Sequence, residues 1–212
     1  MKNLSFNKLH NDRKKLIETN KNKDHILFVG DGNILISAPH GVSQVRLGKY
    51  KYSEIGSLTT ALFLHGETKC HLIAKTKNNN DDANFDENSK YKTSIKKLIQ
   101  EKDIKYLIDI HGLASNRDCD INLGTHIGQN IKNDLDLFNN LYNSLISNGF
   151  NVSIDQPFMA GQQTISGSIN NEFNLWTLQV EINCAITNKK ENFERYKKLL
   201  TILTNWIKTI KP

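Results

Sequence analysis

Apolar and polar positions alternate along the chain in short blocks that have the lengths of strands and helices. Apolar runs of strand length occupy 25–29, 34–37, 70–74, 106–110, 151–154 and 175–182. Other segments repeat apolar residues every three or four positions, which predicts helices over 57–65, around 95–99, over 132–147 and over 190–209. Because strands and helices alternate after the second run, the sequence predicts an α/β fold whose mostly parallel mixed sheet has helices on both faces.

The first two apolar runs are predicted to form a β-hairpin. They flank Asp31-Gly32-Asn33, and Gly and Asn tolerate the positive φ that a tight turn needs. The second run ends at Ala38-Pro39-His40-Gly41, where proline stops the strand pairing and glycine allows a sharp turn. His40 is therefore expected just beyond a strand end.

Four stretches lack a strong apolar period. Residues 1–24 are polar and charged and are predicted to be a short helix or a loose lead-in, whereas 42–53, 76–90 and 155–172 are predicted to be loops. The segment 155–167 is longer than most structureless connections, which favours a functional or mobile role over an ordinary connection.

Length and composition narrow the class of protein. With 212 residues, the chain is predicted to form a single domain over 1–212. No segment has about 18 consecutive apolar residues, and the start of the chain has no apolar signal region. The three widely spaced cysteines fit reduced thiols in a cytoplasm better than a disulfide framework.

The net charge of +6 raises the question of a nucleic-acid partner. The lysines are spread along the chain and gather on predicted helices, without a basic stripe interleaved with aromatic residues. Neither nucleic acid nor a membrane is therefore expected as a partner, and the candidate site described next leads us to expect a small-molecule or peptide substrate.

Chemically active side chains follow three of the predicted strands. His40 lies beyond one strand, His111 ends Tyr106-Leu-Ile-Asp-Ile-His, and Glu181 lies near the end of another strand. Open α/β sheets bind ligands outside the carboxyl ends of their strands, and Glu54, at the end of a loop, could reach the same edge. Two histidines and a carboxylate form a common catalytic zinc set. We therefore predict His40, Glu54 and His111 as zinc ligands and Glu181 as the general base.

Each of these residues also has an ordinary structural explanation. A lone histidine after a strand is often a turn or capping residue, and an acidic residue near a helix start, such as Glu54, is favoured by the helix dipole. Glu181 is less easily explained, since a charge inside an apolar run needs a partner. Asp109 lies two residues before His111 on the same strand face, so we predict that it orients this ligand without binding metal itself.

Several short motifs occur in the order found in the N-formylglutamate amidohydrolase family, and the chain resembles that family from about Ile34 to Ile182. The matching segments are Ser37-Ala-Pro-His-Gly, Glu54-Ile-Gly, Ile108-Asp-Ile-His-Gly, Asp120-Ile-Asn-Leu-Gly-Thr, Asp155-Gln-Pro-Phe-Met-Ala-Gly with Gly167, and Leu178-Gln-Val-Glu-Ile. The resemblance implies a fold related to zinc carboxypeptidases and aspartoacylases. It also implies hydrolysis of an amide by a zinc-activated water, with the ligands and base named above.

The chain departs from that family at one position. The family often has Asp-x-Asn-Arg where this sequence reads Asp82-Ala-Asn-Phe85, and an aromatic ring cannot replace a bidentate arginine. Arg117 and Arg46 are candidates to hold a substrate carboxylate instead, although each could be a solvated loop arginine. The remaining candidates for binding substrate are Asn84, Gln163 and Thr164.

Three functions remain open at this point. The first is a cytoplasmic zinc amidohydrolase acting on an N-acylated amino acid or a small peptide-like amide. The second is a zinc peptidase acting on cell-wall or poly-glutamyl peptides. The third is a metal-free binding protein that retains the cleft, and the presence of both histidines and both glutamates argues against it.

Overall fold

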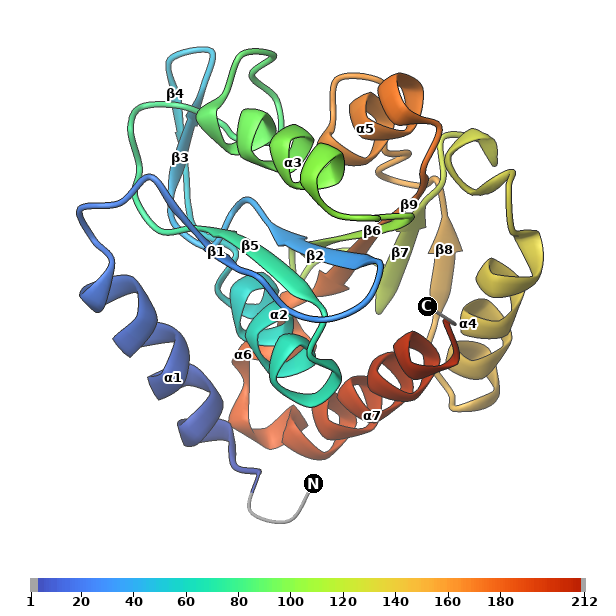
Figure 1. The fold of residues 1–212 in the computed structure, drawn as a ribbon. Helices are drawn as coiled ribbons and strands as arrows, with labels where there is room; N and C mark the ends of the chain where they lie inside the picture. Colours follow the sequence, from blue (N-terminus) through green and yellow to red (C-terminus); the bar gives the residue numbers. More distant parts are fainter. Residues whose placement is uncertain (1–3, 211–212) are drawn as a thin grey trace.

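A computed structural model describes residues 4–210, and its centre is a twisted sheet (Figure 1). Within these residues the sheet has seven strands in the order β1-β5-β2-β6-β9-β7-β8. The pairs β5/β2, β2/β6, β6/β9 and β7/β8 are parallel, whereas β1/β5 and β9/β7 are antiparallel. The strands are β1 (His25–Phe28), β2 (Ile34–Ala38), β5 (His71–Lys75), β6 (Tyr106–Leu113), β7 (Ile121–Gly124), β8 (Val152–Ile154) and β9 (Trp176–Asn183).

Helices cover both faces of this sheet, as the sequence predicts. In Figure 1, α3 (Lys90–Glu101) and α5 (Ile165–Phe173) lie on one face. The other face carries α2 (Ile55–Thr68), α4 (Leu135–Ser147), α6 (Cys184–Asn188) and α7 (Phe193–Thr209), with α1 (Phe6–Thr19) beside α2. The mostly parallel α/β fold predicted from the alternation of elements is confirmed.

The central strands are buried on both faces, which is why they read as continuous apolar runs. Alternate residues of one strand point to opposite faces. Ile36 and Ile108 belong to the larger apolar cluster, which includes residues of α2 and α7, whereas Leu35 and Leu107 belong to a smaller cluster with residues of α3 and α5. Further along β2 and β6, the α3/α5 face becomes polar, and this is where the site lies.

The predicted hairpin between the first two strands is wrong. β1 and β2 each pair with β5, which lies between them. The connecting loop crosses the start of β5, and His71 receives a hydrogen bond from Gly30 N at 3.2 Å and contacts the carbonyl oxygen of Gly32 at 3.1 Å through its two ring nitrogens. The turn-forming residues Asp31, Gly32 and Asn33 therefore lie in a loop that crosses over β5, and they do not form a tight turn between paired strands.

Two predicted loops contain regular structure. Residues 42–53 include a short hairpin of β3 (Gln44–Arg46) and β4 (Lys49–Lys51), joined through Leu47 and Gly48 with φ values of 51° and 73°. Residues 155–172 include most of α5, which Thr164 caps by accepting a hydrogen bond from the backbone N–H of Gly167. The lead-in predicted over 1–24 contains α1 in its described part.

Among residues 4–210, no helix combines the length and the apolar character needed to cross a bilayer. The prediction of one domain over 1–212 extends beyond the described residues at both ends and stays a prediction.

Candidate metal centre and active site

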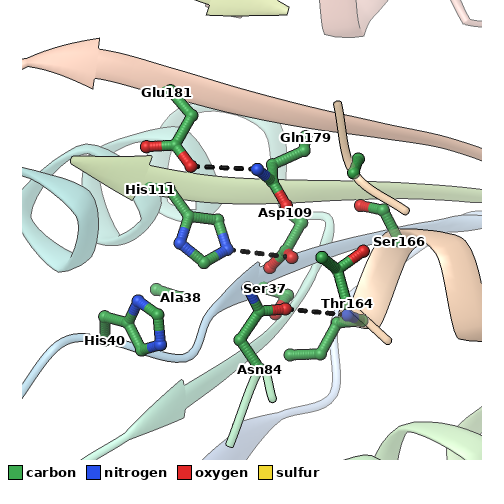
Figure 2. A network of polar contacts seen from close by, with 12 residues as sticks. Ser37, Ala38, His40, Asn84, Asp109, His111, Thr164, Ser166, Gln179 and Glu181 are labelled. Atoms are coloured by element: carbon green, nitrogen blue, oxygen red, sulfur yellow. Dashed lines mark hydrogen bonds and ion pairs between the residues drawn. The ribbon is translucent and has the colours of Figure 1, made fainter. Parts of the chain in front are cut away.

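Three segments at the carboxyl edge of the sheet carry the predicted chemical groups. His111 of β6 is the register partner of Glu181 in β9. On the other side of β9, the register partner of Glu181 is Asn122 of β7. His40 lies two residues beyond the end of β2. Figure 2 shows His40, His111 and Glu181 on the same side of the view. The sheet therefore brings together the groups that the sequence places at strand ends.

Glu54 connects the two histidines. It is the residue before α2, and its backbone N–H donates to the carbonyl of His40 at 2.9 Å. One carboxylate oxygen, Oε1, lies 2.7 Å from Nδ1 of His40, and the other, Oε2, lies 3.3 Å from Nδ1 of His111. One potential ligand atom from each of these three residues lies within 4.8 Å of the other two. The cluster is the one predicted from the sequence.

Close packing against Gly112 fixes Glu54 in this position. The backbone N–H of Gly112 donates to Oε2 of Glu54 at 2.8 Å. A Cβ atom on Gly112 would lie 2.9 Å from Cβ of Glu54, so a larger residue would push the carboxylate away. Glycine at this position therefore allows the ligand loop to approach β6.

A buried aspartate contacts the outer nitrogen of each histidine. Nε2 of His40 lies 2.9 Å from Oδ1 of Asp82, and Nε2 of His111 lies 3.0 Å from Oδ2 of Asp109 (Figure 2 shows the second contact). Such partners fix the orientation and tautomer of metal-binding imidazoles. Asp109 therefore lies next to the histidine it is predicted to orient, and its orienting role stays a prediction.

The charges of the cluster shift the pKa values of its members strongly. Burial would lower the pKa of His40, but Glu54 and Asp82 outweigh it and raise that pKa. Burial would also lower the pKa of His111, but the charges of Asp109 and Glu54 outweigh it, and this pKa lies well above its ordinary value. Burial would raise the pKa of Glu54, and the two histidines hold it far below its usual range. Without a cation, the carboxylate between the imidazoles favours their protonated forms.

Glu181 has the opposite environment. Burial raises the pKa of its carboxyl group to about 7, and the nearby charges of Glu54 and Asp109 act in the same direction while His111 opposes them. The side-chain amide of Gln179 donates from Nε2 to Oε1 of Glu181 at 2.9 Å (Figure 2). Gln179 precedes Glu181 by two residues and points to the same face of the sheet. This contact fixes the position of one carboxylate oxygen.

These groups open into a cleft of about 320 Å³. Its walls are formed by the β3–β4 hairpin, the loop around Phe85 and the segment before α5. The residues around the cleft are His40, Arg46, Lys51, Glu54, Asn84, Phe85, His111, Pro157, Phe158, Met159, Ala160, Gly161, Gln163, Thr164, Gln179 and Glu181. The volume is within the range of small-molecule sites.

The cleft contains four of the five residues predicted to bind substrate. Arg46 and Gln163 line it, and Arg46 donates from Nε to Oδ2 of Asp82 at 2.7 Å. Asn84 also lines it, but its side-chain oxygen accepts a hydrogen bond from Ile165 N at 2.8 Å. The hydroxyl of Thr164 is engaged in capping α5.

Arg117 is the predicted residue that the structure does not bring into the cleft wall. Arg117 is exposed and is not among the residues that line the cleft, although its guanidinium carbon lies 6.0 Å from the ring centroid of Phe158. Of the two predicted arginines, Arg46 is the one placed to meet a substrate group.

Sequence reasoning missed Asp82 and Gln179 as parts of the site. Asp82 belongs to the Asp-x-Asn-Phe segment and was not assigned to His40, because no local spacing relates it to a residue 42 positions earlier. Gln179 had a stronger signal, since it lies two residues before Glu181 in a strand and therefore shares its face.

The donor set suits a divalent metal ion. His40 and His111 both direct Nδ1 to Glu54, and each has Nε2 on a buried aspartate. Two imidazoles and a carboxylate are ligands that zinc accepts, with a fourth position left for water or substrate. Glu54, Asp82, Asp109 and Glu181 bring four carboxyl groups to the cluster, and a bound cation would offset their negative charge.

The comparisons with known proteins bear on the fold. No family model matches the chain, and no curated protein matches its sequence. N-formylglutamate amidohydrolase from Ralstonia eutropha JMP134 is similar in structure at 12% identity, with 88% of this chain and 98% of that chain covered and a TM-score of 0.58. A bacteriophage poly-gamma-glutamate hydrolase matches at 12% identity over 88% of this chain and 89% of that one, with a TM-score of 0.54.

A metallo-carboxypeptidase from Burkholderia cenocepacia has the same fold. It is 11% identical, and the match covers 93% of this chain and 67% of that chain with a TM-score of 0.51. The fold implied by the resemblance to N-formylglutamate amidohydrolases and zinc carboxypeptidases is therefore confirmed. At these identities, the comparisons establish the fold alone.

Proposed function

We propose that this protein is a zinc-dependent hydrolase that cleaves the amide bond of an N-acylated amino acid or a small peptide-like substrate. The observation that carries the proposal is the placement of His40, Glu54 and His111 within 4.8 Å of one another, in a cleft that Glu181 also lines. The similarity in fold to a structure of N-formylglutamate amidohydrolase supports the same reaction class.

His40 and His111 would hold zinc through Nδ1, and Glu54 would hold it through its carboxylate. A zinc ion supplies Lewis acidity, which polarises an amide carbonyl and lowers the pKa of water. Asp82 and Asp109 keep the imidazoles in the tautomer that leaves Nδ1 unprotonated for a ligand.

Glu181 carries the proton in this reaction. Its carboxylate accepts a proton from water as the water oxygen bonds to the amide carbon, and it then gives that proton to the departing nitrogen as the C–N bond breaks. Gln179 holds Oε1 through its amide, so the other oxygen, Oε2, is available for the transfer. Burial favours this role because it brings the pKa of Glu181 to about 7.

Arg46 would bind a carboxylate on the substrate. Its Nε–H is fixed on Asp82, and the remaining guanidinium N–H groups are donors that can hold an anion. The ring of Phe85 lies 4.9 Å from the guanidinium carbon, which restricts the side chain further. This arginine replaces the one that the resemblance leads us to expect at position 85.

Two substitutions distinguish the loss of metal binding from the loss of proton transfer. The zinc-loaded protein is expected to cleave N-acyl amino acids such as N-formyl- and N-acetyl-glutamate, with product amine as the measurement. His111→Ala should lose zinc in metal analysis and lose turnover, whereas Glu181→Gln should retain zinc and lose turnover. His126→Asn, on a loop outside the cleft, is the matched control and should retain both.

The other hypotheses give different results. Absence of bound zinc after purification, with no affinity on titration, would contradict both enzyme hypotheses and favour the metal-free binding protein. Full activity of Glu181→Gln would contradict the assignment of the general base. Cleavage of cell-wall or poly-glutamyl peptides in preference to N-acyl amino acids would favour the peptidase hypothesis. A cytoplasmic location remains a prediction from the cysteine usage.

A further inference from the structure

A second, larger hollow lies beside the catalytic cleft. It has a volume of about 1220 Å³ and is bounded by the loop after β5, by α3 and by α5. Phe85 and Gln163 line both hollows, so one wall is common to the catalytic cleft and to what we call the outer groove. A substrate bound at Glu181 could continue past these two residues.

The common wall is held rigidly from both sides. Asn84 accepts a hydrogen bond from the backbone N–H of Ile165 at 2.8 Å, which joins the Phe85 loop to the start of α5. Lys92 of α3 is buried and donates from Nζ to the carbonyl oxygen of Gln163 at 2.8 Å. The groove is therefore an ordered surface between three segments, and its position relative to the cleft is fixed.

The chemistry of the outer groove suits a polar chain with amide groups. Amide side chains occur along it from Asn79 and Asn88 on the loop to Gln162 and Asn171 near and on α5. An amide can donate and accept hydrogen bonds together, which matches the N–H and C=O groups of a peptide. The cleft alone, at about 320 Å³, has room for a small substrate, whereas the groove adds space for several further residues.

The charges of the groove nearly balance and offer no positive excess to a polyanion. Five carboxylates and three ammonium groups line it. The ammonium group of Lys96 pairs with Glu172 at 2.6 Å, and the buried ammonium group of Lys75, which does not itself line the groove, pairs with two of the carboxylates, Asp24 and Asp81. A chain with a carboxylate on every unit would find no net positive charge there to hold it.

We propose that the outer groove binds an extended peptide of neutral or cationic side chains, which reaches the catalytic cleft across Phe85 and Gln163. The inference rests on the proposed amide hydrolysis and specifies its substrate as a peptide longer than the cleft. It also separates this protein from one that acts on poly-γ-glutamate, because the groove has no excess of positive charge to hold such a chain.

Peptide length is the variable that tests this inference. Zinc-loaded protein is given random-sequence mixtures of dipeptides and of octapeptides lacking Asp and Glu, and newly formed amino groups are measured. The KM for octapeptides is expected to be lower by at least about 10-fold, the factor given by 1.4 kcal/mol of added binding. Poly-γ-glutamate of similar length is expected to show no such gain.

A groove-blocking substitution identifies the surface responsible. Asn171→Trp places a bulky ring on the exposed side of α5 within the outer groove and outside the cleft. It should abolish the advantage of octapeptides while leaving dipeptide hydrolysis unchanged. Asn139→Trp, on the exposed side of α4, is the matched control and should retain the advantage.

The outcomes distinguish this inference from the proposed function. Equal KM values for the two lengths, or an advantage that survives in Asn171→Trp, would overturn the groove while leaving amide hydrolysis intact. A preference for poly-γ-glutamate over octapeptides would overturn it as well. If no amide is cleaved, the proposed function fails. The groove is then tested by fluorescence anisotropy of labelled octapeptides with Glu181→Gln. Adding Asn171→Trp to that variant should abolish octapeptide binding.

Discussion

The imidazoles of His40 and His111 meet edge to face, with ring centroids 4.8 Å apart and planes at 80°. Each ring directs Nδ1 to the shared Glu54 and Nε2 to its own aspartate. The two halves of the site are thus similar in chemistry although they come from different strands. Removing either aspartate should therefore weaken zinc binding.

Asp109→Asn is expected to lower zinc affinity by about 10- to 100-fold, because the amide no longer holds the His111 tautomer that leaves Nδ1 free. Asp82→Asn should have an effect of similar size through His40, and it also releases Arg46. Isothermal titration with zinc measures both. Asp103→Asn, at an exposed position paired with Lys105, is the control and should bind as the unaltered protein does. Unchanged zinc affinity in both site variants would contradict the orienting role.

How far this arrangement follows from sequence depends on distance along the chain. His40, His111 and Glu181 could be predicted because each follows or ends an apolar run, and parallel strands bring such ends to one edge. Glu54 required in addition the expectation that the loop before the predicted helix folds over the same edge, and the resemblance supported that assignment. Asp82 was not assigned, since the loop that carries it reaches His40 only after β5 has entered the sheet beside β2.

The errors in the fold have similar causes. The hairpin predicted around Gly32 would place β1 beside β2, but β5 pairs with both strands, and sequence-local turn signals carry no information about a strand inserted later. Helix α5 was missed because its first turns are rich in Ser, Gly and Asn. Its stability comes instead from the cap at Thr164 and from burial of Ile165 and Ile169 against the sheet.

Arg46→Met should raise the KM for an N-acyl amino acid with a free carboxylate by about 10- to 100-fold, since a hydrogen bond to a charged group contributes about 1.5–3 kcal/mol. Turnover of a matched substrate in which the carboxylate is amidated should change little. Arg117→Met is the control, because Arg117 lies outside the cleft wall. If Arg117→Met rather than Arg46→Met raises the KM, the substrate carboxylate lies on the opposite rim.

Lys75 gives a prediction for stability that is independent of the reaction. Its ammonium group is buried and pairs with Asp24 at 2.7 Å and Asp81 at 2.6 Å. Lys75→Met leaves two carboxylates without their cation, so the free energy of unfolding at neutral pH should fall by about 3 kcal/mol. Lys77→Met, at an exposed neighbouring position, should have little effect. Urea denaturation measures both.

The effect of Lys75→Met should also depend on pH. Burial would raise the pKa of Asp24, but hydrogen bonds from His25 and Lys75 outweigh it and hold the pKa below its ordinary value of 3.8. A carboxyl group with a lowered pKa in the folded state stabilises the protein above its unfolded pKa, and this contribution disappears as pH falls through the folded pKa. The difference between the two proteins should therefore shrink at acid pH, and a difference that grows there would contradict the pairing.

Gly167 shows how closely α5 approaches the cleft wall, and it provides a final test of that wall. A Cβ atom at Gly167 would lie 2.2 Å from the carbonyl oxygen of Gly161, so Gly167→Ala must push the segment before α5 away from the helix. Overpacking of this kind costs about 1–3 kcal/mol of unfolding free energy. The displaced wall should also raise the KM, while zinc affinity stays unchanged because no ligand lies on α5. Gly66→Ala is the matched control, since nothing lies within 4 Å of a Cβ there, and it should stabilise α2 by about 0.5–1 kcal/mol. An unchanged KM in Gly167→Ala, together with the expected loss of stability, would show that the segment before α5 supports the fold but does not contact substrate.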